Sequence, residues 1–431
     1  MENLFVNKYK KSRAHKYPNQ FLYTSLHATG YHFEDLAEDS NNLYRNTPHY
    51  ENHGNQVRPL HRVQDFNYGY TIQREDVNSF GQVGRTDSIP IKTPEIFFNF
   101  EYLLVDGYNE SVCGFVTDGN AQFVCNHLLS NCFAGQNFFI LTGPDAYPIV
   151  GSNLEDFGDT VHVVGIGNCF LNQYAVTAEV GKMPRARLSY EAFNIKSYTN
   201  IINNPIPAIN YRAGDLCPDI KFSIPDTFDS FSYPKVVGLN DIEYRKASKG
   251  ISPASIKMSL DDPGLIAKQI DQEHQNGDAN VQGFTINVPV ANTRMERLGN
   301  YFEFARLPKF PSKIEIKINA ILSEIKQNQS LYNIFCKHIP HNLFITLHDY
   351  CAIDICENQL AQSDASVTFE LRNVVLDSEI LTNTVDDPHR LVELNLSCQV
   401  SGPEDNSSGL FMKGKSFFPD MPKILAWGHP L

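Results

Sequence analysis

The strongest match to a motif that carries chemistry is GLFMKGKS at residues 409–416, which fits the P-loop pattern GxxxxGK[ST]. In a working P-loop, backbone amides and Lys415 would surround a phosphate at the start of a helix. Pro419 and Pro422 follow at once, so this stretch is a poor helix start. We therefore predict a turn flanked by glycines here, without a bound nucleotide.

Metal ligation is the second chemistry that the residue types allow. The only cluster of suitable side chains consists of Cys336, His338, His341, His348, Cys351 and Cys356. Zinc needs four ligands, usually arranged as close pairs. The spacing here does not match a zinc finger, and LFITLHDYC is expected to form a strand between the pairs. We predict ordinary residues at strand ends, and no metal site.

The remaining candidates for catalysis are weaker. The pair Gly165 and Gly167 lacks the third glycine and the following helix of a dinucleotide loop. Asp261 and Asp262 precede Pro263, which predicts a turn or a helix start and not an acid/base pair. The patterns GxSxG and HExxH do not occur in the sequence. We predict no catalytic residue, no cofactor and no enzymatic activity.

Composition limits the class of protein. The 431 residues are enough for two or three domains, and 42% hydrophobic with 20% charged residues indicates a packed chain. The net charge of −13 argues against a general nucleic-acid binder, because phosphate contacts need an excess of Lys and Arg. Nine cysteines without a CxxC pair predict reduced, mostly buried thiols. The sequence has no apolar run of about 20 residues, so we expect no membrane span. It has no apolar core near its start, so we expect no secretory signal.

The elements that must organise the chain are strands. Residues 163–194 predict a strand, a glycine-rich bend, a second strand, a turn at Glu179–Pro184 and a third strand. The run EIFFNFEYLLV after Pro94 predicts another strand, ended by the turn pair Asp106–Gly107. Residues 123–133 predict a helix that Gly135 could end, and NFFILT at 137–142 predicts a buried strand.

These elements suggest five segments. Residues 1–60 predict an extended arm that orders against a neighbour, with a flexible tail as the alternative. Residues 61–210 predict a first compact domain, and 211–280 a linker or insertion that could hold a short helix at Pro263. Residues 281–415 predict a second domain, and 416–431 a C-terminal tail.

An internal repeat relates the two domains. FNYGYTIQREDVNSFG at 66–81 and FTINVPVANTRMERLG at 284–299 have equal length, and a proline followed by a strand comes after each. Helix-like segments follow near 123–133 and 320–339, and then NFFILT and NLFITL. The stretch from Leu171 to Pro184 corresponds to that from Leu376 to Pro388. The order of elements, more than identity, predicts a duplication, and two unrelated β-rich domains are the alternative.

The phrases FGQVGRTDSIPIKTPEIFFNFEYLLVDGYNE and GNCFLNQYAVTAEVGKMPRARLSYEAFN resemble structural proteins of tailed-phage virions of the tail-tube type. SGPEDNSSGLFMKG at 401–414 is also similar to such chains. The resemblance covers about residues 60–210 and 280–415. It implies a mainly β (α+β) fold of two tandem β-sandwich or partial-barrel domains, each with a flanking helix. It brings no catalytic, cofactor-binding or metal-binding residues.

The resemblance also implies a function. The chain is expected to be a non-enzymatic subunit that forms homo-oligomeric rings stacked around a channel, with neighbouring tail proteins as partners. Genomic DNA would pass through the channel without specific binding, because an acidic lumen repels phosphates. We favour six chains per ring over a trimer of tandem domains. The expected place is the virion tail, assembled in the host cytoplasm. A baseplate hub, a tail-terminator ring, a β-sandwich that binds host glycans and a β-sandwich hydrolase are alternatives.

Overall fold

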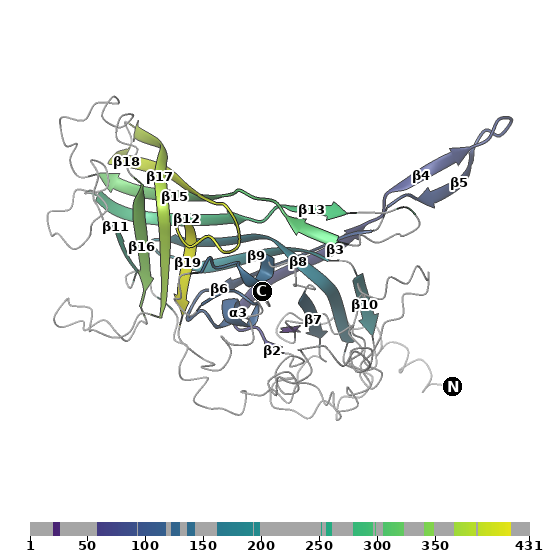
Figure 1. The fold of residues 1–431 in the computed structure, drawn as a ribbon, viewed down its shortest axis with the longest axis horizontal. Coiled ribbons are helices and arrows are strands. Elements are labelled where there is room, and N and C mark those ends of the chain that lie inside the picture. The colour runs from purple at the N-terminus through teal and green to yellow at the C-terminus, as the bar shows by residue number, and fades with distance from the viewer. Residues whose placement is uncertain are drawn as a thin grey trace, which may run out of the picture.

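The chain is mainly β, as the sequence predicted (Figure 1). A computed structural model describes residues 20–25, 58–92, 94–117, 122–129, 136–142, 162–192, 194–198, 251, 256–260, 279–295, 298, 305–322, 340–348, 366–384 and 387–414. Within these residues the strands form one large antiparallel sheet system and two separate hairpins.

The described residues of the first half contain ten strands and two short helical elements. The strands are β1 (Gln20–Ser25), β2 (Arg58–Pro59), β3 (Val63–Thr71), β4 (Arg74–Asn78), β5 (Arg85–Pro90), β6 (Glu95–Leu103), β7 (Gln136–Thr142), β8 (His162–Glu179), β9 (Arg185–Ala192) and β10 (Asn194–Tyr198). The helical elements are α3 (Tyr108–Val112) and the 3-10 turn η3 (His127–Leu129).

The second half contains nine strands in the described residues. They are β11 (Ile256–Leu260), β12 (Ala279–Pro289), β13 (Asn292–Met295), β14 (Ala305–Pro308), β15 (Ser312–Leu322), β16 (His341–Leu347), β17 (Val367–Thr384), β18 (Asp387–Val400) and β19 (Gly409–Gly414).

The two halves pair their strands in the same way. In the first half β1 pairs with β7, β7 and β10 flank the beginning of β8, and β9, β6 and β3 continue the sheet from the end of β8. In the second half β11, β16, β19, β17, β18, β15 and β12 occupy the same places in the same order. We call these halves repeat 1 (β1–β10) and repeat 2 (β11–β19).

Irregularities of the sheet fall at equivalent positions, which fixes the alignment of the repeats. The register shifts between Val63 and Asp65 of β3, and between Val281 and Gly283 of β12. It also shifts after Leu171 of β8 and after Leu376 of β17. Phe66 is therefore equivalent to Phe284, and Leu171 to Leu376, as the internal repeat predicted. Because a bulge changes which side chains face the core, its position is specified by the sequence.

Alternating side chains hold two layers of strands together. In β6 the inward residues Ile96, Phe98, Phe100 and Tyr102 are buried, and the residues between them are more exposed. Across the layers, the Phe138 ring of β7 lies 4.9 Å from Phe98 and 5.5 Å from Phe100 between ring centroids. Tilted aromatic contacts of this kind add to the free energy of burial.

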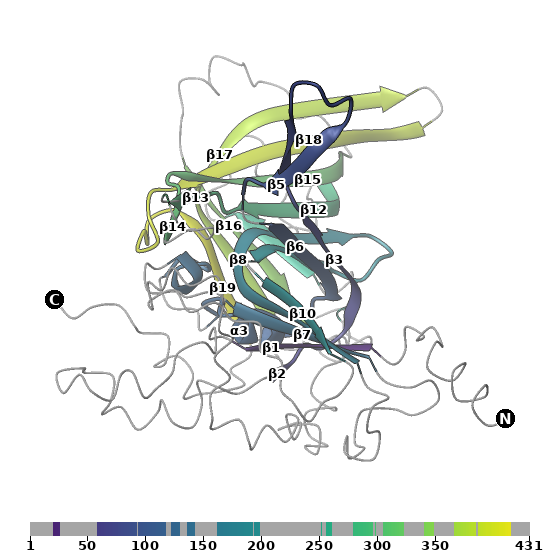
Figure 2. The same cartoon turned by 90° about the vertical axis from the view of Figure 1, so that its right-hand side faces the viewer.

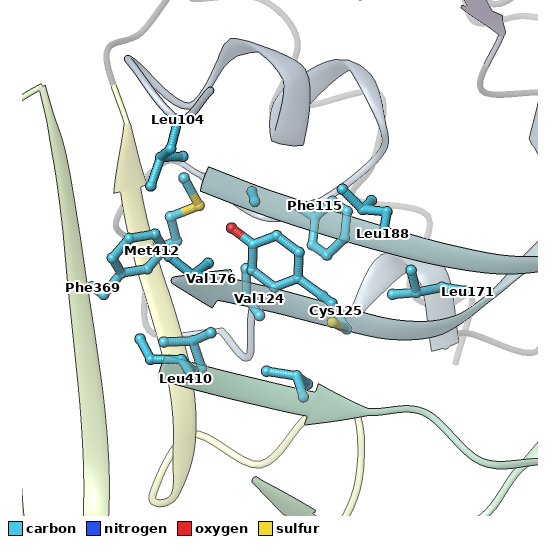
Figure 3. Close-up of a cluster of buried hydrophobic side chains, with 14 of the residues drawn as sticks. Leu104, Phe115, Val124, Cys125, Leu171, Val176, Leu188, Phe369, Leu410 and Met412 are labelled. Atoms are coloured by element: carbon cyan, nitrogen blue, oxygen red, sulfur yellow. The ribbon is translucent and has the colours of Figure 1, made fainter. Parts of the chain in front are cut away.

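The core continues from one repeat into the other. Figure 3 shows Phe369, Leu410 and Met412 of repeat 2 among buried side chains of repeat 1. The backbone N–H of Val124 donates to the carbonyl of Leu410 at 2.9 Å, so β19 is attached to the segment after α3. The two repeats share one core.

Several expectations were wrong. In place of a helix over 123–133, the described part of that segment is irregular with the 3-10 turn η3, because the Val124 N–H bonds to another strand and not within a helix. The glycine-rich bend near Gly165 is absent, and β8 is one strand through it. Ala320–Leu322 ends a strand, β15.

Two strands lie in segments that we expected to lack them. β1 is within the predicted arm and β11 within the predicted linker, and each pairs with the equivalent strand of its repeat. Leu22 and Met258, at equivalent positions, are both buried. The expected helices at Pro263 and at 323–339 lie outside the described residues.

Candidate assembly edges

The feature of the fold that bears on function is the joint between the repeats. The last part of β8 pairs antiparallel with β12, from Gln173 opposite Pro289 to Glu179 opposite Gly283. The backbone N–H of Val290 extends this ladder by donating to the carbonyl of Asn172 at 2.7 Å. The inward side chains on both strands are buried, namely Tyr174, Val176, Ala178, Phe284, Ile286 and Val288. The joint is a continuous piece of sheet.

One glycine permits the close approach of these strands. A Cβ atom on Gly283 would lie 2.8 Å from the carbonyl oxygen of Ala178. That distance is shorter than a van der Waals contact, so a larger residue would push the strands apart. Toward the other end of the joint, the Gln173 side chain donates to Asn287 Oδ1 at 2.6 Å.

A hairpin reinforces the joint. The β13–β14 hairpin of repeat 2 reaches over repeat 1, where Arg294 lies 2.8 Å and Arg306 3.3 Å from the Glu191 carboxylate of β9. The Arg306 guanidinium also stacks 4.8 Å above the centre of the Phe170 ring. Burial alone would raise the pKa of Glu191, but the two arginines outweigh it and hold the pKa below its usual value.

Repeat 1 presents an edge equivalent to β12 that carries no partner strand within the described residues. β3 pairs with β6 on one side only. Tyr68 is 38% and Tyr70 62% exposed, whereas the equivalent Ile286 and Val288 of β12 are 0% exposed. These side chains lie where repeat 2 buries apolar groups.

Repeat 2 presents the complementary edge. The last part of β17, Ser378–Thr384, is equivalent to the β8 strand of the joint and, among described strands, pairs with β18 alone. Ile380 is 50% exposed. Glu379 takes the place of the buried Tyr174, and partial burial of its carboxylate raises its pKa.

A second hairpin extends from repeat 1. The β4–β5 hairpin is equivalent to β13–β14 and points away from the body of the molecule, at the right of Figure 1. Figure 2 views the molecule from that side. All of β4 is exposed, and Phe80 and Val83 near the hairpin tip are fully exposed. Exposed apolar side chains in a long projection are typical of surfaces that contact a partner.

The residues considered for chemistry have other roles where the structure describes them. Gly409–Gly414 is strand β19, so the expectation of a turn was wrong, and a strand here also lacks the geometry of a P-loop. Gly165 and Gly167 lie inside β8. His341 begins β16 opposite Val374. Cys336, His338, Cys351, Cys356, Asp261 and Asp262 lie outside the described residues.

The described residues contain no group of three or more His, Cys, Asp or Glu side chains placed to hold a metal ion. Their helices are all too short to span a membrane. Four of the nine cysteines, Cys113, Cys125, Cys169 and Cys398, are buried free thiols, as predicted for these positions.

Comparison with known proteins gives distant similarity only. No protein-family model and no curated protein matches the chain. A chain of the sheath-tube complex of an extracellular contractile injection system (PVC, extended state) is 11% identical and aligns 38% of this chain with 91% of its own at a TM-score of 0.23. A chain from the anti-feeding prophage cap structure (AFP tube terminating cap) is 12% identical, with 30% and 74% aligned and a TM-score of 0.19. An Hcp protein is 13% identical, with 37% and 96% aligned and a TM-score of 0.19. At these scores the similarity supports no conclusion about function.

Proposed function

We propose that this chain is a non-enzymatic structural subunit of a tube of the phage-tail type, which assembles with copies of itself into rings stacked around a channel. The observation that supports the proposal is the edge-to-edge joint of two equivalent repeats. A unit that adds a second unit through one edge, and keeps the opposite edge open, can add further units in the same direction. Such a heterologous contact closes into a ring when its rotation permits.

Sheet edges that have no partner strand among the described residues also need an explanation in a stable protein. Unpaired N–H and C=O groups on an edge invite pairing with another chain, and proteins usually block them. Here β3 carries exposed tyrosines in place of the lysines and prolines that would block pairing. A closed ring would satisfy these groups and remove both edges.

The joint bears on the number of chains. Both repeats of one chain lie in one sheet, and this supports a ring to which both repeats contribute. A ring of six repeats then needs three chains. We therefore favour a trimer of tandem repeats over the six-chain ring that the sequence alone suggested.

Charge is consistent with a channel. An acidic lumen would let DNA pass without binding, because acidic walls repel phosphates, and the net charge of −13 supplies a surplus of acidic residues for such a surface. The proposed location is the virion tail, with assembly in the host cytoplasm and neighbouring tail proteins as further partners. A baseplate hub or tail-terminator ring would use the same contact.

Size-exclusion chromatography with light scattering, followed by negative-stain imaging, tests this function. We expect rings or tubes with a central hole and a smallest closed species of three times 48.7 kDa. A stable particle of one chain at micromolar concentration would contradict the proposal and would favour a glycan-binding module or a hydrolase. Closed rings of six chains would contradict the trimer alone.

A further inference from the structure

We propose that the joint between β8 and β12 within the chain is the template for the contact between chains. The β3 edge of one copy pairs with the β17 edge of the next, and the β4–β5 hairpin lies over the sheet of that next copy. This inference rests on the proposed function and adds to it the partner, the two surfaces and the register. The partner is a second copy of this chain.

The equivalence of the repeats sets the register. Residues of β12 correspond to residues of β3, and residues of β8 correspond to residues of β17, through the shared bulges and strand pairs. Gly283 pairs with Glu179 in the joint, so Asp65 of one copy should pair with Thr384 of the next copy. By the same mapping, the following residues of β3 and of the partner's β17 pair as Asn67 with Thr382, Gly69 with Ile380, and Thr71 with Ser378.

Exposed apolar area on these edges fits the same contact. Tyr68 and Tyr70 would become covered as Ile286 and Val288 are in the joint. Tyr70 falls opposite Glu379, whose partly buried carboxylate can accept a hydrogen bond from the phenol. The edge strands would therefore contribute apolar burial as well as backbone hydrogen bonds to the contact.

Charges on the hairpins are complementary in both joints, with the signs exchanged. Within the chain, Arg294 of β13 lies 3.5 Å from Glu95 at the start of β6. The position of Arg294 corresponds to Asp76 of β4, and that of Glu95 corresponds to Lys313 of β15. If the β4–β5 hairpin lies on the next copy in the way that β13–β14 lies on repeat 1, Asp76 comes close to Lys313 of that next copy. The exchange keeps attraction at the contact between chains and specifies head-to-tail order.

In the single chain both groups have exposed local partners. Asp76 lies 3.1 Å from Arg85, and Lys313 lies 2.8 Å from Asp377. Exposed pairs of this kind contribute little to stability. Asp76 and Lys313 can therefore leave these local partners and pair with each other between chains at a small cost in free energy.

Disulfide trapping tests the register. Thr71→Cys and Ser378→Cys are prepared as separate full-length variants, mixed in equal amounts and oxidised. The side chains of Thr71 and Ser378 are both exposed. The equivalent residues in the joint, Pro289 and Gln173, lie directly opposite each other as a non-hydrogen-bonded pair. The Cα atoms of such a pair are close enough for a disulfide. We expect covalent dimers, at least tenfold above either variant alone. Thr71→Cys mixed with Ile380→Cys is the matched control, because Ile380 is two residues out of register and also exposed.

Charge reversal tests the hairpin contact. Asp76→Lys should weaken assembly about fivefold, as should Lys313→Asp, and the two changes together should restore it. Asp87→Lys makes the same charge change on the opposite face of the hairpin and should leave assembly unchanged. Restoration by the double variant shows that neither single change acts through misfolding.

The outcomes separate this inference from the proposed function. Rings that form without the Thr71–Ser378 cross-link, or that trap Thr71–Ile380 instead, overturn the contact proposed here and leave the ring intact. Hydrogen exchange on the unmodified chain gives an independent measurement: amides of Asp65–Thr71 and Ser378–Thr384 should become protected on assembly. Protection elsewhere, with these edges unchanged, overturns it too. Absence of assembly overturns the function itself.

Discussion

Glu110 is a carboxyl group inside the core of repeat 1. Its side chain is 1% exposed, and its Oε1 accepts a hydrogen bond from the Tyr174 hydroxyl at 3.2 Å. Burial raises its pKa to about 7, and the nearby charge of Asp106 adds to the rise, while hydrogen bonds from neighbouring groups oppose it. Repeat 1 therefore folds with this group favoured in its protonated form.

The consequence is a loss of stability as pH rises. The folded protein binds one more proton than the unfolded chain between pH 4.5, the ordinary value, and about 7. The free energy of unfolding should fall by about 3 kcal/mol through that window and level off above it. Glu110→Gln keeps the shape and the hydrogen-bond acceptor but cannot titrate. Denaturant unfolding at pH 4 and pH 8 should show a smaller pH dependence in the variant by about that amount. An equal pH dependence in both proteins would contradict this account.

Single residues also show what the sequence could and could not predict. Phe66 and Phe284 could be matched because each begins a stretch of equal length that ends in glycine. Glu110 gave no such signal, since a carboxylate just after the turn at Asp106–Gly107 suggests a solvated surface. Its hydrogen-bond partner in the core, Tyr174, is distant in sequence and on another strand. Contacts of that kind are absent from local patterns.

Among the elements, strands with one buried face were predictable and the others were not. β6 and β9 alternate buried and exposed residues, and both were predicted. β4 is exposed at every residue, so REDVN carries no alternation and the hairpin was missed. The helix predicted at 123–133 was wrong although the segment has an apolar pattern. Its backbone is bonded to β19 of repeat 2, through the Val124 N–H, and not within a helix.

The β4–β5 hairpin should act in assembly and not in folding. Phe80 and Val83 are fully exposed, so Phe80→Ser with Val83→Ser should leave the melting temperature unchanged. If the tip is buried by another copy, each lost side chain removes about 1.5–3 kcal/mol of contact, and assembly should weaken at least about tenfold. Analytical ultracentrifugation over a concentration series measures this. Met183→Ser, in the exposed β8–β9 turn, is the control and should assemble normally. An unchanged distribution in the hairpin variant would remove the tip from the interface.

At the scale of the whole molecule, the arrangement of the repeats decides the polarity of assembly. The sequence predicted that two related units exist, but not that β8 and β12 join them into one sheet, because pairing between distant strands depends on tertiary contacts. That joint leaves β3 at one end and β17 at the other. The two ends differ, so copies should add head to tail and not as symmetric pairs.

Blocking each end separately tests that polarity. In the joint, the backbone N–H of Val290 donates to Asn172, and in an antiparallel pair every second residue makes such a bond to the neighbouring strand. Val288 and Tyr174 are therefore bonded positions. Their equivalents, Tyr70 and Glu379, point their backbone N–H and C=O groups toward the next copy. Proline there removes an outward N–H and spares the bonds to the inner neighbour. Tyr70→Pro alone and Glu379→Pro alone should each stay a single chain of 48.7 kDa with unchanged circular dichroism.

Mixed together, these two variants should form a discrete one-to-one dimer, because one intact β3 edge meets one intact β17 edge and neither complex can grow further. Native mass spectrometry distinguishes this species from longer series. Glu379→Gln keeps the backbone N–H and should assemble as the unmodified chain does. A symmetric dimer of either proline variant alone would show that like edges pair, and head-to-tail assembly would be wrong.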